Sequence, residues 1–153
     1  MSTFAQHILV ATDFSQASHL ALNAAGLLAQ TLGAKVTLIH VFDAAPFAVA
    51  SLPMQPIDLV GNARDLAERI EKGLNELRET LLKGVTEVDI KVVEHTSPAE
   101  GICESARQVG ADLIVVSTHG RTGLSHLLIG SVAERVVRHA PCPVLTLRSK
   151  AEG

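Results

Sequence analysis

Five short apolar runs alternate with longer stretches of helical character, and this alternation constrains the fold more than any other feature of the chain. The runs lie at 7–11, 36–42, 87–95, 112–117 and 144–148. Strands that alternate with helices predict parallel strands joined by crossover helices, because a parallel connection needs a dozen or more residues. We therefore expect an α/β fold: a doubly wound five-stranded parallel sheet with helices on both faces.

The intervening stretches carry start and stop signals for four helices. The first ends at Gly33, and the second is a long amphipathic helix over 57–82. The third begins at SPAE (97–100), a capping box with proline at the first helical position, and stops at Gly110. The fourth runs through His139 and is ended by the prolines of PCP.

The order of the strands follows from where the charged residues lie. Run 87–95 alternates apolar and charged residues, which is typical of an edge strand, whereas 36–42 and 112–117 have the apolar character of buried strands. This favours the order 3-2-1-4-5, with the switch point between strands one and four. Ligands bind beyond the carboxyl ends of the strands at such a point, so a site is expected around 11–13 and 117–120.

Composition limits the classes of partner. The 153 residues fit one domain, 1–153, and no apolar run approaches the roughly 20 residues of a membrane span. A net charge of −3 and the absence of Trp and Tyr argue against nucleic-acid binding. The N-terminal segment has no basic region typical of a signal peptide, and the isolated Cys103 and Cys142 favour a reducing, cytoplasmic location.

A glycine-rich stretch, STHGRTGLSHLLIGSV (117–132), leads into the last helix. Gly120 and Gly123 would let the loop curl, and Gly130 and Ser131 would offer N–H groups at a helix N-terminus, where phosphate binds favourably. The stretch is not a Walker A loop, and no GxGxxG follows the first strand. A purely structural role stays open, because SVAE, beginning at Ser131, is also typical of a capping box.

Individual side chains near the switch point leave several roles open. Asp13 ends the first strand, which favours a ribose or adenine contact, but DFSQ also fits a capping box with Asp13 as N-cap. His119 lies in the loop and can contact ligand, and Arg121 can neutralise phosphate or point to water. The seven histidines lack the spacing of a helical zinc site, so no protein-ligated metal is expected. No catalytic residue is nominated, since the spacing imposes no triad and no general base.

The late loop resembles the signature of the universal stress protein family: a glycine, two residues, a glycine, nine residues, then Gly-Ser or Gly-Thr. Here Ser117 replaces the first glycine, Gly120 is the second, and Gly130 and Ser131 close the pattern; the proline frequent two residues before the aspartate is Ala11. ILVATDFSQAS, VTLIHVF, ADLIVVSTHGRTGL and LIGSVAERVVRHAPCPVLTLR extend the resemblance over nearly the whole chain. The resemblance implies an adenine nucleotide alpha hydrolase-like fold and places the chain among the family members that bind ATP.

The resemblance also implies a set of contacts. Asp13 and the backbone at Val41 would face the adenosine, Gly120, Gly130 and Ser131 would hold the phosphates, and any Mg²⁺ would be held mostly by phosphate and water. Valine at position 130 is expected to block phosphate approach and leave the fold intact. The complete predicted nucleotide-binding set is Ala11, Thr12, Asp13, Val41, Val116, Ser117, Thr118, His119, Gly120, Arg121, Gly123, Gly130, Ser131 and Val132.

The expected function is that of a cytoplasmic ATP-binding stress protein, a regulatory module loaded with nucleotide. One alternative is a slow ATPase or phosphotransfer enzyme on the same site, which the missing base disfavours; at most weak ATP hydrolysis is expected. Another is a nucleotide-free dimeric interaction protein, which the intact Gly130 and Ser131 disfavour.

The last strand predicts an assembly. Its apolar residues, 144–147, form an open sheet edge without a charge run or interior proline, and a two-fold partner is the commonest solution for such an edge. The resemblance implies the same homodimer. We expect antiparallel pairing across 143–148, with higher oligomers left open, and we expect proline at Leu145 to weaken the dimer more than the monomer fold.

Overall fold

The computed structural model describes residues 4–45, 59–119 and 129–149. Strands and helices alternate along these ranges as the apolar runs predict, with boundaries that differ by one or two residues. In chain order the elements are β1 (His7–Ala11), α1 (Gln16–Leu32), β2 (Lys35–Phe42), α3 (Leu59–Leu81), β3 (Val88–Glu94), α4 (Pro98–Val109), β4 (Leu113–Ser117), α5 (Ser131–His139) and β5 (Val144–Leu147).

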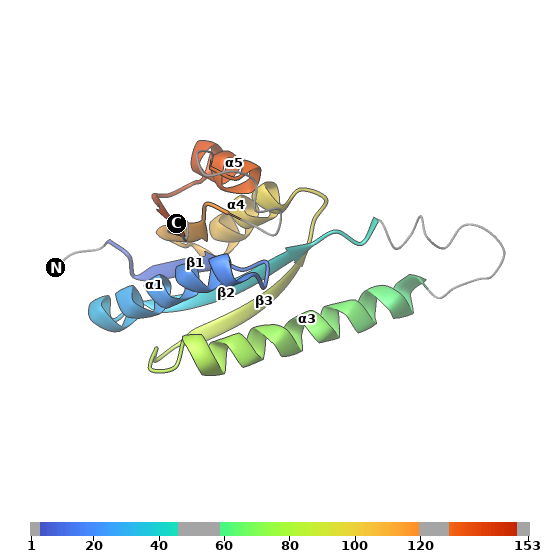
Figure 1. Cartoon of the computed structure of the whole chain (residues 1–153), viewed down its shortest axis with the longest axis horizontal. Helices are drawn as coiled ribbons and strands as arrows, with labels where there is room; N and C mark the ends of the chain where they lie inside the picture. Colours follow the sequence, from blue (N-terminus) through green and yellow to red (C-terminus); the bar gives the residue numbers. More distant parts are fainter. Residues whose placement is uncertain (1–3, 46–58, 120–128, 150–153) are drawn as a thin grey trace.

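The five strands form one parallel sheet in the order β3-β2-β1-β4-β5, which confirms the predicted topology. Helices α1 and α3 cover one face and α4 and α5 the other (Figure 1). Strand β1 lies at the centre, so successive side chains enter different cores. Ile8 and Val10 pack with the α1 and α3 side, and Leu9 packs with the α4 and α5 side. All three are fully buried.

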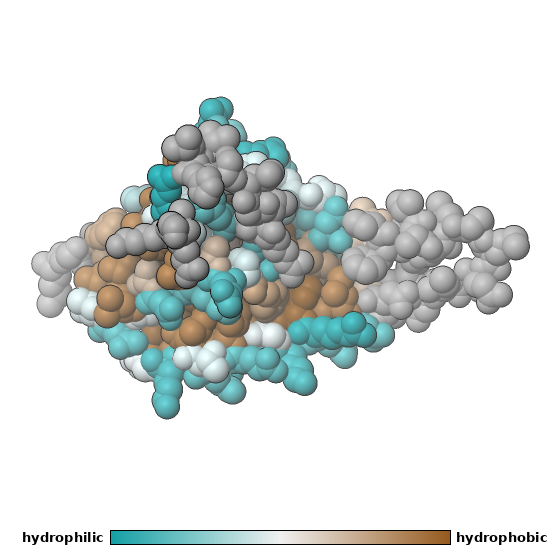
Figure 2. Space-filling model, in the orientation of Figure 1, coloured by the Kyte–Doolittle hydropathy of each residue, from teal (hydrophilic) through white to brown (hydrophobic). Residues whose placement is uncertain are grey.

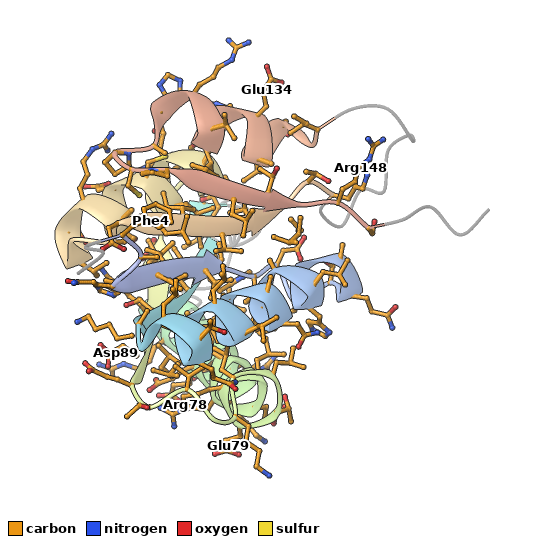
Figure 3. The ribbon with its side chains drawn as sticks, turned by 90° about the vertical axis from the view of Figure 1, so that its left-hand side faces the viewer. Phe4, Arg78, Glu79, Asp89, Glu134 and Arg148 are labelled. Atoms are coloured by element: carbon orange, nitrogen blue, oxygen red, sulfur yellow. The ribbon has the colours of Figure 1, made fainter. Side chains whose placement is uncertain are left out.

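The two edges of the sheet differ in character. At the β3 edge, Asp89 is exposed and the strand has no fully buried residue, as expected from its charged alternation. Figure 2 shows hydrophilic residues along the outer side of the neighbouring α3, with apolar residues above them toward the sheet. In the view of Figure 3, Arg78 and Glu79 of α3 lie at the opposite end of the molecule from Glu134 of α5.

The β5 edge corrects one expectation. The Ile114 N–H donates to the Pro143 carbonyl, and the Thr118 N–H donates to the Leu147 carbonyl. Backbone groups alternate between the two sides of a strand, so Leu145 also directs its N–H and carbonyl at β4. The expectation for proline at Leu145 was therefore wrong, because that proline removes a donor from the monomer's own sheet.

Two predicted helix caps also differ from the structure. The N-cap of α1 is Ser15, whose hydroxyl accepts from the Ser18 N–H, and not Asp13. The N-cap of α5 is Gly130, with no side-chain hydrogen bond, so the capping box at Ser131 was wrong. Among the described helices, none is both long and apolar enough to cross a membrane.

Candidate functional site

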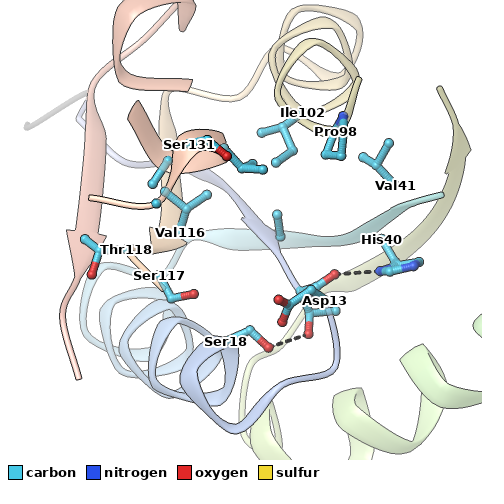
Figure 4. Close-up of a pocket in the computed structure, with 15 residues that line it drawn as sticks. Asp13, Ser18, His40, Val41, Pro98, Ile102, Val116, Ser117, Thr118 and Ser131 are labelled. Carbon is cyan, nitrogen blue, oxygen red and sulfur yellow. Dashed lines mark hydrogen bonds between the residues drawn. The ribbon is translucent and has the colours of Figure 1, made fainter. Parts of the chain in front are cut away.

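A pocket of about 290 Å³ opens where β1 and β4 end, beneath the first turns of α4 and α5 (Figure 4). Its volume lies near the lower end of the roughly 300–1,000 Å³ of small-molecule sites. The position is the switch point of the sheet, as the strand order predicts. The lining residues are Ala11, Thr12, Asp13, Ser18, His40, Val41, Pro98, Ile102, Val116, Ser117, Thr118, Gly130, Ser131, Val132 and Ala133.

The structure brings most of the predicted residues together around this pocket. Of the predicted set, His119 is described and is not part of the lining. Gly120, Arg121 and Gly123 lie outside the described residues. The predicted residues that line the pocket are Ala11, Thr12, Asp13, Val41, Val116, Ser117, Thr118, Gly130, Ser131 and Val132.

Five lining residues were missed: Ser18, His40, Pro98, Ile102 and Ala133. Pro98 and Ile102 are four residues apart on α4 and so share one face of that helix. The spacing was visible in the sequence, but which helix face meets the pocket depends on how α4 packs on the sheet.

Asp13 lies in a loop whose backbone is anchored at several points. The Thr12 N–H donates to the Ile39 carbonyl over 3.0 Å, and the His40 Nδ1 lies 2.7 Å from the Thr12 carbonyl oxygen. Because a carbonyl oxygen only accepts, His40 carries a proton on Nδ1. Asp13 Oδ1 in turn accepts from the Ser15 N–H and hydroxyl. The carboxylate is therefore oriented by the protein alone.

The start of α5 offers backbone donors to the opposite side of the pocket. The N–H groups of Ser131, Val132 and Ala133 precede the first intrahelical bond, which joins the Glu134 N–H to the Gly130 carbonyl over 3.0 Å. The positive end of the helix dipole lies at this point and favours an anion. Thr118 Oγ1, on the same side, is buried and has no hydrogen-bond partner among the described residues.

Gly130 has a different role from the one expected. Its N–H donates to the Thr118 carbonyl over 2.6 Å and is thus not offered to a ligand. A Cβ at position 130 would lie 2.6 Å from the same carbonyl oxygen, closer than real Cβ contacts come. The expectation that valine here would leave the fold intact was therefore wrong, because any side chain must displace the start of α5.

One wall of the pocket is apolar. Val41, Pro98, Ile102 and Val116 enclose the space between the Asp13 loop and α5. An apolar slot beside a carboxylate, with N–H donors opposite, suits a ligand that has a flat apolar part, hydroxyls and an anionic end. Within the described ranges, no three His, Cys, Asp or Glu side chains are grouped so as to hold a metal ion.

Comparison with known proteins assigns the family. The model of the universal stress protein family matches residues 5–148. This chain belongs to the universal stress protein family. A putative universal stress protein of Staphylococcus epidermidis is 34% identical over 146 residues, covering 95% of this chain and 85% of the relative. A universal stress protein of Methanocaldococcus jannaschii is 36% identical, covering 92% of this chain and 81% of that protein.

Solved structures of similar proteins share the fold of this universal stress protein. The hypothetical protein MJ0577 superposes with a TM-score of 0.82 at 27% identity, covering 98% of this chain and 100% of that one. A universal stress protein from Lactobacillus plantarum gives 0.77 at 25% identity, with 96% and 100% covered. A universal stress protein in complex with cAMP gives 0.67 at 26% identity, with 97% and 100% covered.

Proposed function

We propose that this universal stress protein binds ATP in the pocket between β1 and β4 and acts as a nucleotide-loaded regulatory module. The main support is that the oriented Asp13 carboxylate and the N–H donors in the first turn of α5 line the same pocket. A structurally similar universal stress protein was solved with cAMP, which is also an adenine nucleotide. The regulatory output would be a change in loop order or partner binding that depends on the nucleotide.

The geometry suggests how ATP would lie. The adenine fits the apolar walls at Val41, Pro98 and Ile102, with the ribose hydroxyls toward Asp13. The triphosphate would lie over the start of α5, where the Ser131 hydroxyl adds a donor to the N–H groups. His119, Gly120, Arg121 and Gly123 complete the proposed set. A Mg²⁺ ion would be held chiefly by phosphate and water oxygens.

Replacing Ser131 with Ala tests the phosphate end. The N-cap of α5 is Gly130, so Ser131 does not cap the helix, and we expect the unfolding transition of Ser131→Ala to match that of the parent. A hydrogen bond to a charged group contributes about 1.5–3 kcal/mol, so the Kd for ATP should rise about 10- to 150-fold. Isothermal titration calorimetry measures this directly. The matched control is Ser131→Thr, which keeps the hydroxyl and should bind like the parent.

Two further results would decide against the proposal. Nucleotide released when the purified protein is denatured should be ATP, identified by chromatography and mass. A parent protein that releases no nucleotide and shows no heat of binding with ATP would favour a nucleotide-free interaction protein. An unchanged Kd in Ser131→Ala would place the phosphates elsewhere.

A slow ATPase on the same site is the second candidate. Asp13 and His40 are titratable groups in the pocket lining, and Figure 4 shows both on the side away from Ser131 and Thr118. Both also take part in hydrogen bonds within the protein. A general base must reach the attacking water, so this placement favours slow turnover or none. Steady hydrolysis well above about 1 s⁻¹, the low end of common enzyme rates, would favour the enzyme instead.

We also propose a single domain over 1–153, a cytoplasmic location and a homodimer through β5. Both Cys103 and Cys142 are free thiols, and burial raises the pKa of each, so neither is an activated nucleophile. Free thiols accord with a reducing compartment. The dimer is supported by the place of β5 at the end of the strand order, where, among the described residues, it pairs only with β4.

A further inference from the structure

We propose that Gly73 of α3 and Phe14 are positioning residues that hold Asp13 in place for the nucleotide. Neither residue lines the pocket. The inference rests on the proposed function, because it assigns the support of the ribose side of the same site. Three independent features meet at Phe14: its backbone conformation, its ring contacts and the absence of a side chain at Gly73.

The Phe14 backbone adopts a conformation that a bulky residue rarely takes. Its φ is +65°, in the left-handed region that favours glycine. Strain of this kind persists only where the surroundings over-determine it, and it gathers at functional sites. Here the Phe14 N–H donates to Thr12 Oγ1 over 3.0 Å, and Thr12 Oγ1 lies 2.8 Å from Ser18 Oγ. The side chains of the loop thus hold the turn in which Asp13 is the central residue.

The Phe14 ring contacts residues from two other elements, β2 and α3. Its centroid lies 4.8 Å from that of the His40 ring, at an interplanar angle of 50°. On α3, a Cβ built at Gly73 would lie 2.9 Å from Phe14 Cε1 and 3.3 Å from Cζ. Glycine at position 73 therefore lets the ring lie directly against the α3 backbone while the ring also contacts His40.

A displaced ring would disturb Asp13 through its neighbours. His40 contacts the Phe14 ring and also holds the Thr12 carbonyl through Nδ1. Asp13 lies between Thr12 and Phe14 in the chain, so the two contacts fix the backbone on both sides of the carboxylate. If the ring moves, its contact with His40 changes, and the hydrogen bond between His40 and the Thr12 carbonyl is strained.

Glycine at position 73 lowers the stability of α3, so its presence there calls for a packing explanation. The residue lies in the interior of α3, where glycine is less favourable than alanine by about 1 kcal/mol. The close approach of Phe14 supplies that reason. Since alanine favours the helix but collides with the ring, Gly73→Ala separates helix stability from the geometry of the site.

The experiment compares ATP with inorganic tripolyphosphate as calorimetric probes. In Gly73→Ala we expect the Kd for ATP to rise at least about fivefold, which corresponds to ~1 kcal/mol, with the Kd for tripolyphosphate unchanged. The double variant Gly73→Ala/Phe14→Leu lacks the ring atoms that collide with the new Cβ. Its Kd for ATP should therefore lie within about twofold of the Kd of the single variant Phe14→Leu. Lys72→Ala, at an exposed neighbouring position on α3, controls for the effect of an alanine substitution in this turn of the helix and should bind like the parent.

The outcomes separate this inference from the proposed function. A parent protein that binds no ATP overturns both. A parent that binds ATP while Gly73→Ala binds it equally well overturns only the role of Gly73 and Phe14. Equal losses of ATP and tripolyphosphate affinity, or no recovery in the double variant, would show a general structural defect and would also overturn the positioning role.

Discussion

His7 and His40 lie on neighbouring strands at opposite ends of the sheet. His40 contacts the loop of the pocket, whereas His7 begins β1 at the amino end. His7 is buried, and its Nε2 lies 2.7 Å from Thr37 Oγ1. Burial lowers the pKa of His7 below its ordinary value, and the Lys35 charge lowers it further. The folded state therefore favours the neutral ring.

This lowered pKa predicts a pH dependence of stability. Below about pH 6.5, the ordinary pKa of histidine, His7 binds a proton more readily in the unfolded chain than in the folded chain. The contribution of His7 is therefore present above that pH and is lost as the pH falls through the folded pKa. The free energy of unfolding, from urea titrations between pH 7.5 and 5, should fall less steeply in His7→Gln than in the parent. Parallel curves over this whole range would contradict the prediction.

Single residues also show where inference from sequence reaches its limit. Asp13 and Ser131 could be placed at the site because a residue at a strand end or helix start has a position fixed by topology. The role of Gly130 could not be predicted, because its N–H donates to the carbonyl of Thr118, a residue distant in sequence. Phe14 was missed for the same reason, since its partners Gly73 and His40 are distant in sequence.

The helices end where local sequence signals predict. Both α1 and α4 are followed by glycines with left-handed backbone, Gly33 at φ 67° and Gly110 at φ 68°. The Gly110 N–H donates back to carbonyls of the last turn, and a Cβ at either glycine would meet no atom within 4 Å. Alanine at these positions would thus suffer only the backbone strain.

Because backbone strain acts there without a steric clash, the end of α4 allows a prediction about stability. Gly110→Ala should lower the free energy of unfolding by about 1 kcal/mol, since an L-residue resists positive φ. Gly110→Asn, a residue that tolerates this conformation, should cost less. Urea unfolding measures both. Since Gly110 lies at the far end of α4 from Pro98, the Kd for ATP should match the parent's; a weakened Kd would mean that the end of α4 is coupled to the pocket.

The elements as a set were predictable, but the walls of the pocket were only partly so. Apolar runs, capping signals and glycine stops are local, and together they gave the strand order that the structure confirms. Pro98 and Ile102 enter the pocket because α4 packs over the end of β2, which no local pattern records. Residues 120–128 lie outside the described residues, so their predicted contacts stay predictions.

At the scale of the whole molecule, the sheet has one charged edge and one apolar edge. The β3 edge has Asp89 exposed, which discourages pairing with another strand. At the β5 edge, Pro143, Leu145 and Leu147 direct their backbone groups at β4. By alternation, Val144 and Thr146 direct theirs outward. An antiparallel copy of β5 would take up these outward groups and cover the side chain of Leu145, which is 37% exposed.

Because the backbone N–H of Thr146 points away from β4, this residue is suited to test the proposed dimer. Thr146→Pro removes an outward N–H and leaves the bonds to β4, since proline is tolerated on an edge strand. Two-fold symmetry removes the donor from both copies, and at about 1 kcal/mol each the dimer Kd should rise roughly 30-fold. Thr146→Val keeps the N–H and should remain dimeric. Sedimentation velocity across micromolar concentrations measures the equilibrium. A monomeric parent would rule out the dimer, and a Thr146→Pro dimer as tight as the parent's would place the interface on another surface.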